Sequence, residues 1–515
     1  MHKTLFGELS FNKQYFYLSI LISILTFLPQ ILFSQKEMHT LLLCLALLVL
    51  VGIPKFSKIL FAIFVIYINI ANVLIGHIAF HWGYVVPDIT PRIEVAFLTP
   101  SYEASEYISH YLDHRDFILF FYTLFVLFLL YKFMKHYTHS YRVLKIIGAG
   151  VSLLGLLSIL YFTNPLKEME PFNVPCEVCN VINEKEKIDR LMFERTKYIQ
   201  TLKLTKAAKE HQLYDKIVII MGESVNKNHM ALYGYDQNTT PFFSSLQHDK
   251  NFYVFNTISP TNQTRFSIPI DLTDANVSDF ENRFVHSCSI LTNFKANDYK
   301  TYWISNQGRA GKNDSTIASM AYEANITYFA NLNYLDAKTD DTLLTYLKTL
   351  KNSPEKEMYL IHLMGSHADY VNRYDHATAL FKKPKNMIQE YDNSIHYTDY
   401  ILSKIFEHFK GQKVLLIYLS DHGENISIDN NGHGFLPSYK DEYSVPFVIY
   451  SSVKNPKIDE IKRDNKKGYI NLENFNYMVQ YISGISDEKR LSFSPDVISV
   501  EPDNIWDFED MDFYN

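Results

Sequence analysis

The chain has 515 residues, a formal net charge of −7, and hydrophobic and aromatic contents of 47% and 15%. This apolar content excludes an intrinsically disordered chain, and the lack of a basic excess argues against nucleic-acid binding. The length predicts two or three domains.

The first third of the chain contains five long apolar runs with almost no charge. They cover residues 15–33, 40–53, 59–80, 117–131 and 146–162. Most approach the roughly 20 residues that a helix needs to cross a bilayer. The run at 40–53 is short enough for a buried core helix, but its composition and its position between stronger runs favour a membrane crossing. We therefore predict five transmembrane helices and no cleaved signal peptide.

Lysine and arginine in the short connections predict the orientation of these helices. They precede the first run, separate the second from the third, and connect the fourth to the fifth: Lys3, Lys13, Lys55, Lys58, Lys132, Lys135, Arg142 and Lys145. The connection at 81–116 is instead acidic. The N-terminus is therefore predicted to be cytoplasmic. Everything after Phe162 is expected on the other side of the inner membrane, in the periplasm of a bacterium with two membranes.

The segment 164–212 begins with three prolines and continues as a charged helical stretch. It predicts a linker between a membrane domain at 1–163 and a second domain at 213–515, although such a helix could also lie on the lipid surface. Within it, Cys176 and Cys179 favour a local disulfide if the compartment is oxidising. The alternatives are half of a redox or metal site.

From residue 213 onward, short apolar runs alternate with helical or loop stretches, which is typical of an α/β domain. The clearest runs are 216–221, 301–305, 358–363, 414–420 and 446–450. Their nearly continuous apolar character predicts a mainly parallel sheet whose strands are buried on both faces by flanking helices. In such sheets ligands bind beyond the carboxyl ends of the strands, so the residues that follow these runs are expected to meet in one crevice.

Several of these runs end in residues that bind metal ions. Glu223 follows the first run, Asp421 and His422 follow the fourth, and His367 and His433 are expected around the same crevice. Carboxylate and imidazole groups are ligands that zinc accepts. A single histidine or aspartate in such a place is more often structural. The prediction of a metal site therefore depends on several strands ending in potential ligands.

The order of the motifs resembles bacterial phosphoethanolamine transferases, members of the alkaline phosphatase–sulfatase superfamily that modify lipopolysaccharide at the inner membrane. The motifs are Gly222-Glu223-Ser224, His229-Met230-Ala231-Leu232-Tyr233-Gly234-Tyr235, Thr239-Thr240-Pro241, Thr264-x-x-Ser267-x-Pro269, Trp303-Ile304-Ser305-Asn306-Gln307, Gly365-Ser366-His367, Ser420-Asp421-His422-Gly423-Glu424 and Gly432-His433-Gly434. The resemblance covers nearly the whole chain, because family members also have five spans before a periplasmic domain. It implies an alkaline phosphatase-like fold for residues 213–515.

The resemblance also implies a set of site residues. The implied zinc ligands are Glu223, Thr264, Asp421 and His422. One zinc ion is implied, and the presence of a second is left open. Thr264 would be the nucleophile, because coordination to zinc lowers the pKa of its hydroxyl group. His367 and His433 match positions that contact the transferred phosphoryl group or a second metal, and we expect them to take part in catalysis.

Two serines compete with Thr264 for the role of nucleophile. Ser224 could instead cap a helix, and Ser267 lies three residues after Thr264 on the same expected helical face. The residues alone leave the three hydroxyl groups equal, and the resemblance favours Thr264. The cysteines that are common near the nucleophile in the family are replaced by Ser259-Pro260-Thr261-Asn262.

Four further residues are candidates for substrate binding. Glu103 and Glu106 lie in the acidic connection and could contact an ethanolammonium group, or they could be ordinary solvated acids. Gln307 and Lys312 could contact a phosphate or the acceptor, and an ordinary surface lysine is the alternative for Lys312.

The expected function is transfer of phosphoethanolamine from phosphatidylethanolamine to lipopolysaccharide, on lipid A or a core heptose, through a covalent phosphoethanolamine-threonine intermediate at Thr264. The expected partners are the donor lipid, the lipopolysaccharide acceptor and membrane lipids, with no nucleic acid, and we expect a monomer. One alternative is a phosphoglycerol transferase that uses phosphatidylglycerol. Another is an inactive, membrane-anchored binding protein. A sulfatase or phosphodiesterase is disfavoured, because hydrolysis needs no membrane half.

Overall fold

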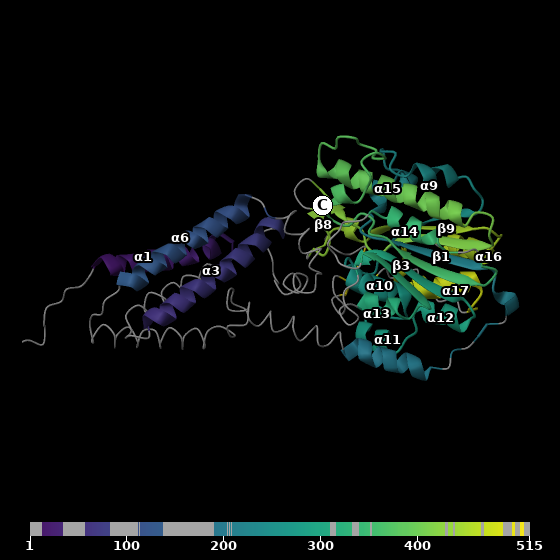
Figure 1. Ribbon diagram of the computed structural model, residues 1–515, viewed down its shortest axis with the longest axis horizontal. Helices are drawn as coiled ribbons and strands as arrows, with labels where there is room; N and C mark the ends of the chain where they lie inside the picture. Colours follow the sequence, from purple (N-terminus) through teal and green to yellow (C-terminus); the bar gives the residue numbers. More distant parts are fainter. Residues whose placement is uncertain are drawn as a thin grey trace, which may run out of the picture. The chain divides into compact units, whose positions relative to one another are not determined.

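The computed structural model describes residues 13–33, 57–82, 112, 114–136 and 190–202, and most of 204–508. The positions between 204 and 508 that it leaves out are 205, 208, 309–315, 332–338, 351–352, 428–430, 436–437, 465–467, 488–496 and 500–504. The chain divides into two compact units (Figure 1), Met1–Thr99 with Ile108–Lys185 and Pro100–Tyr107 with Glu186–Asn515.

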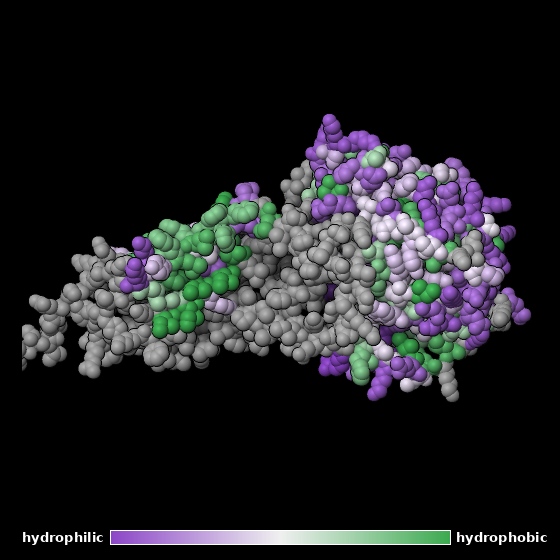
Figure 2. Space-filling model, in the orientation of Figure 1, coloured by the Kyte–Doolittle hydropathy of each residue, from purple (hydrophilic) through white to green (hydrophobic). Residues whose placement is uncertain are grey.

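Three long helices are described in the first unit: α1 (Lys13–Phe33), α3 (Ser57–Trp82) and α6 (His114–His136). They share a small apolar core that includes Ile22, Phe61, Val65, Val126 and Phe133. Their outer faces are also apolar, and Figure 2 shows hydrophobic side chains on the surface of this unit. Large exposed side chains of this kind include Ile63, Ile70, Phe117, Ile118 and Phe121. A water-facing helix would carry polar groups at such positions.

Among the described residues, one segment is long and apolar enough to cross a membrane. It is His114–Lys135, with 22 residues and a mean hydropathy of 2.2, whereas the apolar parts of α1 and α3, Tyr17–Thr26 and Phe61–Ile70, are shorter. The predicted runs 15–33, 59–80 and 117–131 fall within α1, α3 and α6. The runs 40–53 and 146–162 lie outside the described residues, as do Cys44, Cys176 and Cys179.

An eight-stranded sheet forms the centre of the second unit, in the order β10-β2-β9-β6-β1-β5-β3-β4. The strands are β1 (Lys216–Gly222), β2 (Phe252–Ile258), β3 (Lys300–Gly308), β4 (Ile326–Asn331), β5 (Glu357–His362), β6 (Val414–Ser420), β9 (Ser444–Ser451) and β10 (Ile470–Asn471). β1 runs parallel to β5 and β6, whereas β9 runs antiparallel to both β6 and β2. The five predicted runs are confirmed as β1, β3, β5, β6 and β9. The sheet is mixed but mainly parallel.

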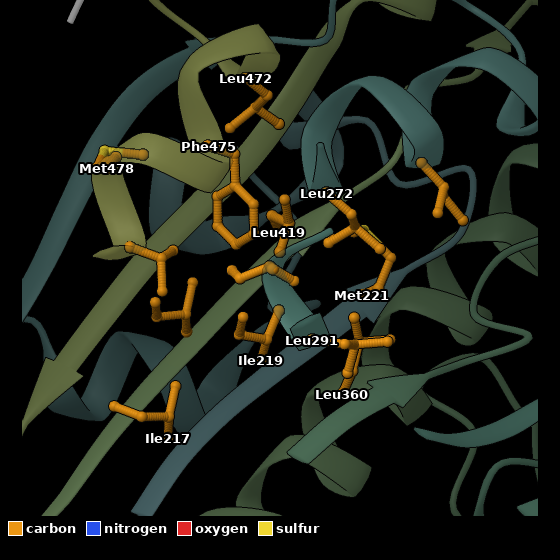
Figure 3. Close-up of a cluster of buried hydrophobic side chains, with 14 of the residues drawn as sticks. Ile217, Ile219, Met221, Leu272, Leu291, Leu360, Leu419, Leu472, Phe475 and Met478 are labelled. Atoms are coloured by element: carbon orange, nitrogen blue, oxygen red, sulfur yellow. The ribbon is translucent and has the colours of Figure 1, made fainter. Parts of the chain in front are cut away.

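Helices cover both faces of this sheet. Along β1, Ile217, Ile219 and Met221 face one apolar core, and Val218 and Ile220 face the other. Figure 3 shows part of the first core. The first core is covered by α10 (Thr264–Leu272), α11 (Phe280–Val285), α12 (Ile290–Ala296), α13 (Thr316–Ala321), α16 (Pro456–Asp464) and α17 (Phe475–Ser483). The second is covered by α9 (Pro241–Leu246), α14 (Asp341–Leu347) and α15 (Met387–His408). This is the α/β architecture that buries parallel strands on both sides.

Smaller elements complete the second unit. The 3-10 helices are η1 (Lys209–His211), η2 (Lys227–His229), η3 (Ala231–Tyr233), η4 (Tyr370–Asn372), η5 (Lys440–Glu442) and η7 (Leu472–Asn474). Two short antiparallel pairs are formed by β7 (Asn425–Ile426) with β8 (Asn431–Gly432) and by β11 (Val497–Ser499) with β12 (Ile505–Asp507).

A helix at 190–201, within the segment predicted as a linker, is fixed to the second unit. Its Arg195 is buried, with 1% of its surface exposed. It donates hydrogen bonds to Glu323 (3.1 Å) and to the carbonyl oxygen of Ser287 (2.9 Å). A buried guanidinium with several acceptors holds its helix firmly in place. This helix therefore belongs structurally to the second unit.

Candidate active site

The residues that follow β1 are held in one conformation by close packing. Glu223 is buried, and Ser224 has a φ of 58°, in the left-handed region. The Ser224 hydroxyl donates to Glu223 Oε1 (2.7 Å), and its backbone N–H donates to Asp421 Oδ1 (3.2 Å). Gly365 lies against Glu223, and a Cβ atom at position 365 would be 2.8 Å from the backbone N and O atoms of Glu223. The Glu223 backbone is thus packed against Gly365, and its carboxylate is held by the Ser224 hydroxyl.

The residues that follow the neighbouring strand β6 point into the same site. Asp421 and His422 are completely buried. His422 Nδ1–H donates to the carbonyl oxygen of Gly423 (2.8 Å), which leaves Nε2 directed toward Glu223 Oε1 (3.2 Å). Asp421 Oδ1 accepts the N–H of His422 (2.8 Å), while its Oδ2 is buried without a hydrogen-bond partner among the described residues.

Thr264 brings a hydroxyl group to this pair of strand ends. It begins α10, and its Oγ1 lies 3.2 Å from Glu223 Oε2 and 3.0 Å from His422 Nε2. The two rival hydroxyl groups are buried and already bonded, Ser224 to Glu223 and Ser267 to Thr261 Oγ1 (2.7 Å). Thr264 is the partly exposed hydroxyl of the three.

The charges of this cluster fit a bound cation. Burial and the charge of Glu223 raise the pKa of Asp421. Burial also acts to raise the pKa of Glu223, but the hydrogen bond and charge of His422 outweigh it and hold that pKa low. Two carboxylates, an imidazole nitrogen and a hydroxyl form a donor set of the kind that zinc accepts, and among the described residues Asp421 Oδ2 has no hydrogen-bond partner. The residues present therefore fit a zinc ion.

A second group of potential ligands lies beside the first and consists of His422, Glu424 and His433. The ring of His433 is 4.1 Å from that of His422 and 6.4 Å from that of His367. His433 Nδ1 bonds to Glu424 Oε2 (2.6 Å), and the hydroxyl of Tyr370 donates to Glu424 Oε1 (2.6 Å). These contacts fix the tautomer of His433 and leave its Nε2 available.

The structure thus brings together most of the predicted site residues: Glu223, Thr264, His367, Asp421, His422 and His433. Gln307 joins them through Nε2, which donates to Glu223 Oε2 (3.3 Å) and to the carbonyl oxygen of Leu363 (2.9 Å). The predicted residues Glu103, Glu106 and Lys312 lie outside the described residues.

Two residues of this site have no assigned role in the sequence prediction. Glu424 stands in the motif Ser420-Asp421-His422-Gly423-Glu424 but is not among the residues predicted to act in the site. Tyr370 lies in no such motif, and it reaches Glu424 only through the fold.

The loop that leads to Thr264 is held by hydrogen bonds. The Ser259 hydroxyl bonds to the carbonyl oxygens of Asp421 (2.5 Å) and Thr261 (2.7 Å). Asn262 Nδ2 donates to Glu442 Oε2 (2.7 Å). Among the described residues Cys288 is a free, buried cysteine.

Comparisons with known proteins show the family and the fold of the chain. The family model described as Sulfatase matches residues 215–479, and the chain belongs to this family. Its relatives include a putative transferase, YhbX, of Escherichia coli K12, 29% identical over 294 residues that cover 55% of this chain and 52% of the relative. The phosphoethanolamine transferase EptA of Helicobacter pylori is 30% identical over 257 residues, 46% of this chain and 47% of the relative. The chain thus spans about half the length of the curated relatives it matches.

Two solved structures share the fold. The integral membrane protein lipooligosaccharide phosphoethanolamine transferase A from Neisseria meningitidis has a TM-score of 0.61 at 15% identity, and the match covers 93% of this chain and 96% of that protein. The C-terminal periplasmic domain of EptC from E. coli, in complex with Zn, has a TM-score of 0.54 at 22% identity, covering 60% of this chain and 98% of that domain. At these identities the likeness shows an alkaline phosphatase-like α/β fold.

Proposed function

We propose that this protein is a membrane-anchored phosphoethanolamine transferase that uses phosphatidylethanolamine as donor and lipopolysaccharide, at lipid A or a core heptose, as acceptor. The observation that carries the proposal is the Thr264 hydroxyl, which lies 3.0 Å from His422 and 3.2 Å from Glu223 at the ends of two adjacent strands. The names of the relatives supply the class of transferred group and acceptor.

Glu223, Asp421, His422 and Thr264 Oγ1 would hold a zinc ion, and the number of ions stays open. When bound, zinc supplies a Lewis acid that lowers the pKa of a hydroxyl ligand and polarises a phosphoryl oxygen. The protein fixes the ligands in advance, through Ser224 and Gly365 for Glu223 and through Gly423 for His422. This pre-organisation keeps the nucleophile in a reactive position.

The reaction has two displacements. Thr264 Oγ attacks the phosphorus of the donor, so that a bond from phosphorus to Thr264 forms and the bond to the diacylglycerol oxygen breaks. Diacylglycerol leaves with a proton. An acceptor hydroxyl or phosphate oxygen then attacks the same phosphorus, and the bond from phosphorus to Thr264 Oγ breaks. Thr264 Oγ takes up a proton, from the acceptor hydroxyl or from water when the acceptor is an ionised phosphate, and the hydroxyl is restored.

His433 is the best placed group to move these protons. Its Nδ1–H is held by Glu424, so Nε2 can accept or donate a proton at the reacting oxygen. His367 Nδ1 is buried without a hydrogen-bond partner among the described residues. We propose that His367 stabilises the negative charge on the phosphoryl oxygens.

The proposed donor is a lipid of the bilayer, so the first unit would hold the enzyme at the membrane where this donor lies. We propose five spans with a cytoplasmic N-terminus and a periplasmic catalytic domain, supported by the exposed apolar faces of α1, α3 and α6. Glu103 and Glu106 are proposed contacts for the ethanolammonium group, and Lys312 and Gln307 for phosphate or acceptor.

Incubation of the purified full chain with headgroup-labelled phosphatidylethanolamine tests the proposal. We expect mass spectrometry to find the added phosphoethanolamine on Thr264, and Thr264→Ala to carry none. Labelling of Thr264→Ala at another residue would refute this nucleophile. Labelling from phosphatidylglycerol instead would indicate a phosphoglycerol transferase, and a chain without bound zinc and without labelling would indicate a binding protein.

A further inference from the structure

The C-terminal hairpin of β11 and β12 lies against the loop that leads to the proposed nucleophile. Ser499, at the end of β11, forms a parallel bridge with Thr261, three residues before Thr264. The backbone N–H of Ser499 donates to the carbonyl oxygen of Pro260 (2.9 Å). A segment more than 230 positions later in the sequence thus pairs with this loop at a single β-bridge.

The hairpin is held there by a separate apolar cluster. Ile498 and Phe508 are buried and pack with Ile258 and Tyr443. Ile258 ends β2, immediately before the loop, and Tyr443 follows η5. The backbone N–H of Ser259 donates to the carbonyl oxygen of Tyr443 (2.9 Å), which joins these two segments beneath the hairpin.

The loop between Ile258 and Thr264 has irregular backbone, so its position depends on such contacts. Its far end starts α10, where the N–H of Ser267 donates to the carbonyl oxygen of Gln263 (3.0 Å). A shift of the loop would therefore shift Thr264 relative to Glu223 and His422, which belong to the strands β1 and β6. A displacement of about 1 Å in a reacting group can reduce a rate on the order of a hundredfold.

We propose that the paired strands β11 and β12, together with Phe508, are a positioning element for Thr264: they fix the loop at 259–263 so that the Thr264 hydroxyl stays within reach of Glu223 and His422. The hairpin itself touches neither substrate nor the reacting atoms. The inference rests on the proposed function only in taking Thr264 as the nucleophile.

The test compares Ser499→Pro with Ser499→Ala in the full chain. Proline removes the N–H that bonds to Pro260, whereas alanine keeps it. For Ser499→Pro we expect the single-turnover rate of Thr264 modification to fall roughly tenfold or more, with the KM for the donor lipid and the zinc content unchanged. Hydrogen exchange of the amides at 259–263 should become faster in the same variant. Ser499→Ala keeps this N–H, so its rate and its exchange at 259–263 should stay much closer to the wild type than those of Ser499→Pro.

Equal exchange and equal rates in the two variants would overturn the proposal, as would a loss of thermal stability with an unchanged rate. If Ser499→Pro does not fold, Ile498→Val provides a smaller perturbation of the apolar cluster, and the same pattern is expected at reduced size. If Ile498→Val has the wild-type rate and the wild-type exchange at 259–263, the hairpin does not position Thr264. Absence of Thr264 modification in the wild type would refute the proposed function, while the exchange at 259–263 would still decide whether the hairpin orders the loop.

Discussion

At the scale of single residues, Gly365 leaves no room for a side chain beside the proposed metal ligand Glu223. It has a φ of +54°, and a Cβ atom would lie 2.8 Å from the backbone of Glu223. We expect Gly365→Ala to displace Glu223 and to lower zinc affinity, as measured by titration of the purified protein. Gly411→Ala is the matched control, because Gly411 has a φ of +82° with open space around it. It should cost about 1 kcal/mol of stability and leave zinc binding unchanged.

Tyr370 provides a second test at this scale. Its hydroxyl donates to the buried Glu424, which in turn holds His433. Tyr370→Phe should lower turnover roughly tenfold, because groups that orient a reacting imidazole have effects of this size. It should also reduce stability by about 1–3 kcal/mol, since a buried carboxylate loses a donor.

Tyr418→Phe is the control for this variant, because the Tyr418 hydroxyl is buried without a hydrogen-bond partner among the described residues. Its turnover and melting temperature should equal or exceed those of the wild type. If Tyr370→Phe behaves like Tyr418→Phe, Glu424 and Tyr370 do not orient His433.

The sequence could identify residues of the site that stand next to one another in motifs, and it could not identify those joined only by the fold. Asp421 and His422 are adjacent and, like Glu223, directly follow a strand. Because the carboxyl ends of parallel strands lie at one edge of the sheet, the sequence predicts that these three residues lie close together. The choice among Thr264, Ser224 and Ser267 depended on a resemblance. In the structure these hydroxyl groups differ in burial, which no local pattern reveals.

At the scale of elements, α9 is capped by a residue from another helix. Asp399 of α15 accepts the backbone N–H groups of Phe242 (2.7 Å) and Phe243 (3.1 Å) in the first turn of α9. Burial raises the pKa of Asp399 to about 7, despite these two hydrogen bonds. The folded protein therefore keeps a proton on Asp399 at pH values where the unfolded chain, with a pKa near 4, has lost it.

This raised pKa predicts a pH dependence of stability. Between about pH 4 and pH 7 the folded state binds more protons at Asp399 than the unfolded state, so the contribution of Asp399 to the free energy of unfolding falls as the pH rises. The total change is at most about 4 kcal/mol. Thermal melting of Asp399→Asn should show a weaker decline over this window than the wild type. Asp236→Asn, at an exposed position, should follow the wild type, and an equal slope in Asp399→Asn would contradict the prediction.

The strands that could be predicted were those buried on both faces. β1, β5 and β6 have no exposed position, and this gives the continuous apolar runs seen in the sequence. β10 has two residues, too few for any periodic pattern. The antiparallel direction of β9 was not predictable either, because an apolar run has the same composition in both directions.

At the scale of the whole molecule, the two units bury their apolar residues in opposite ways. The second unit encloses them on both faces of a sheet, whereas Phe117, Ile118 and Phe121 of α6 are 55%, 66% and 63% exposed. An exposed apolar surface of this kind costs free energy in water and is stable in lipid. The contrast explains how a chain of moderate overall hydrophobicity can combine a part with an apolar surface, which we propose lies in the bilayer, with a domain whose apolar residues are enclosed.

The proposed topology can be tested with a reporter enzyme that is active only outside the cytoplasm, fused after residue 56, 100, 140 or 190. The distribution of lysine and arginine predicts inactive fusions at 56 and 140 and active fusions at 100 and 190. The fusion at 190 is decisive for function, because Thr264 can meet acceptors on the outer side only if the second unit lies there. An inactive fusion at 190 together with an active one at 100 would mean an odd number of crossings between these positions, most simply that the run at 146–162 does not cross the membrane. The acceptor would then have to be sought on the cytoplasmic side.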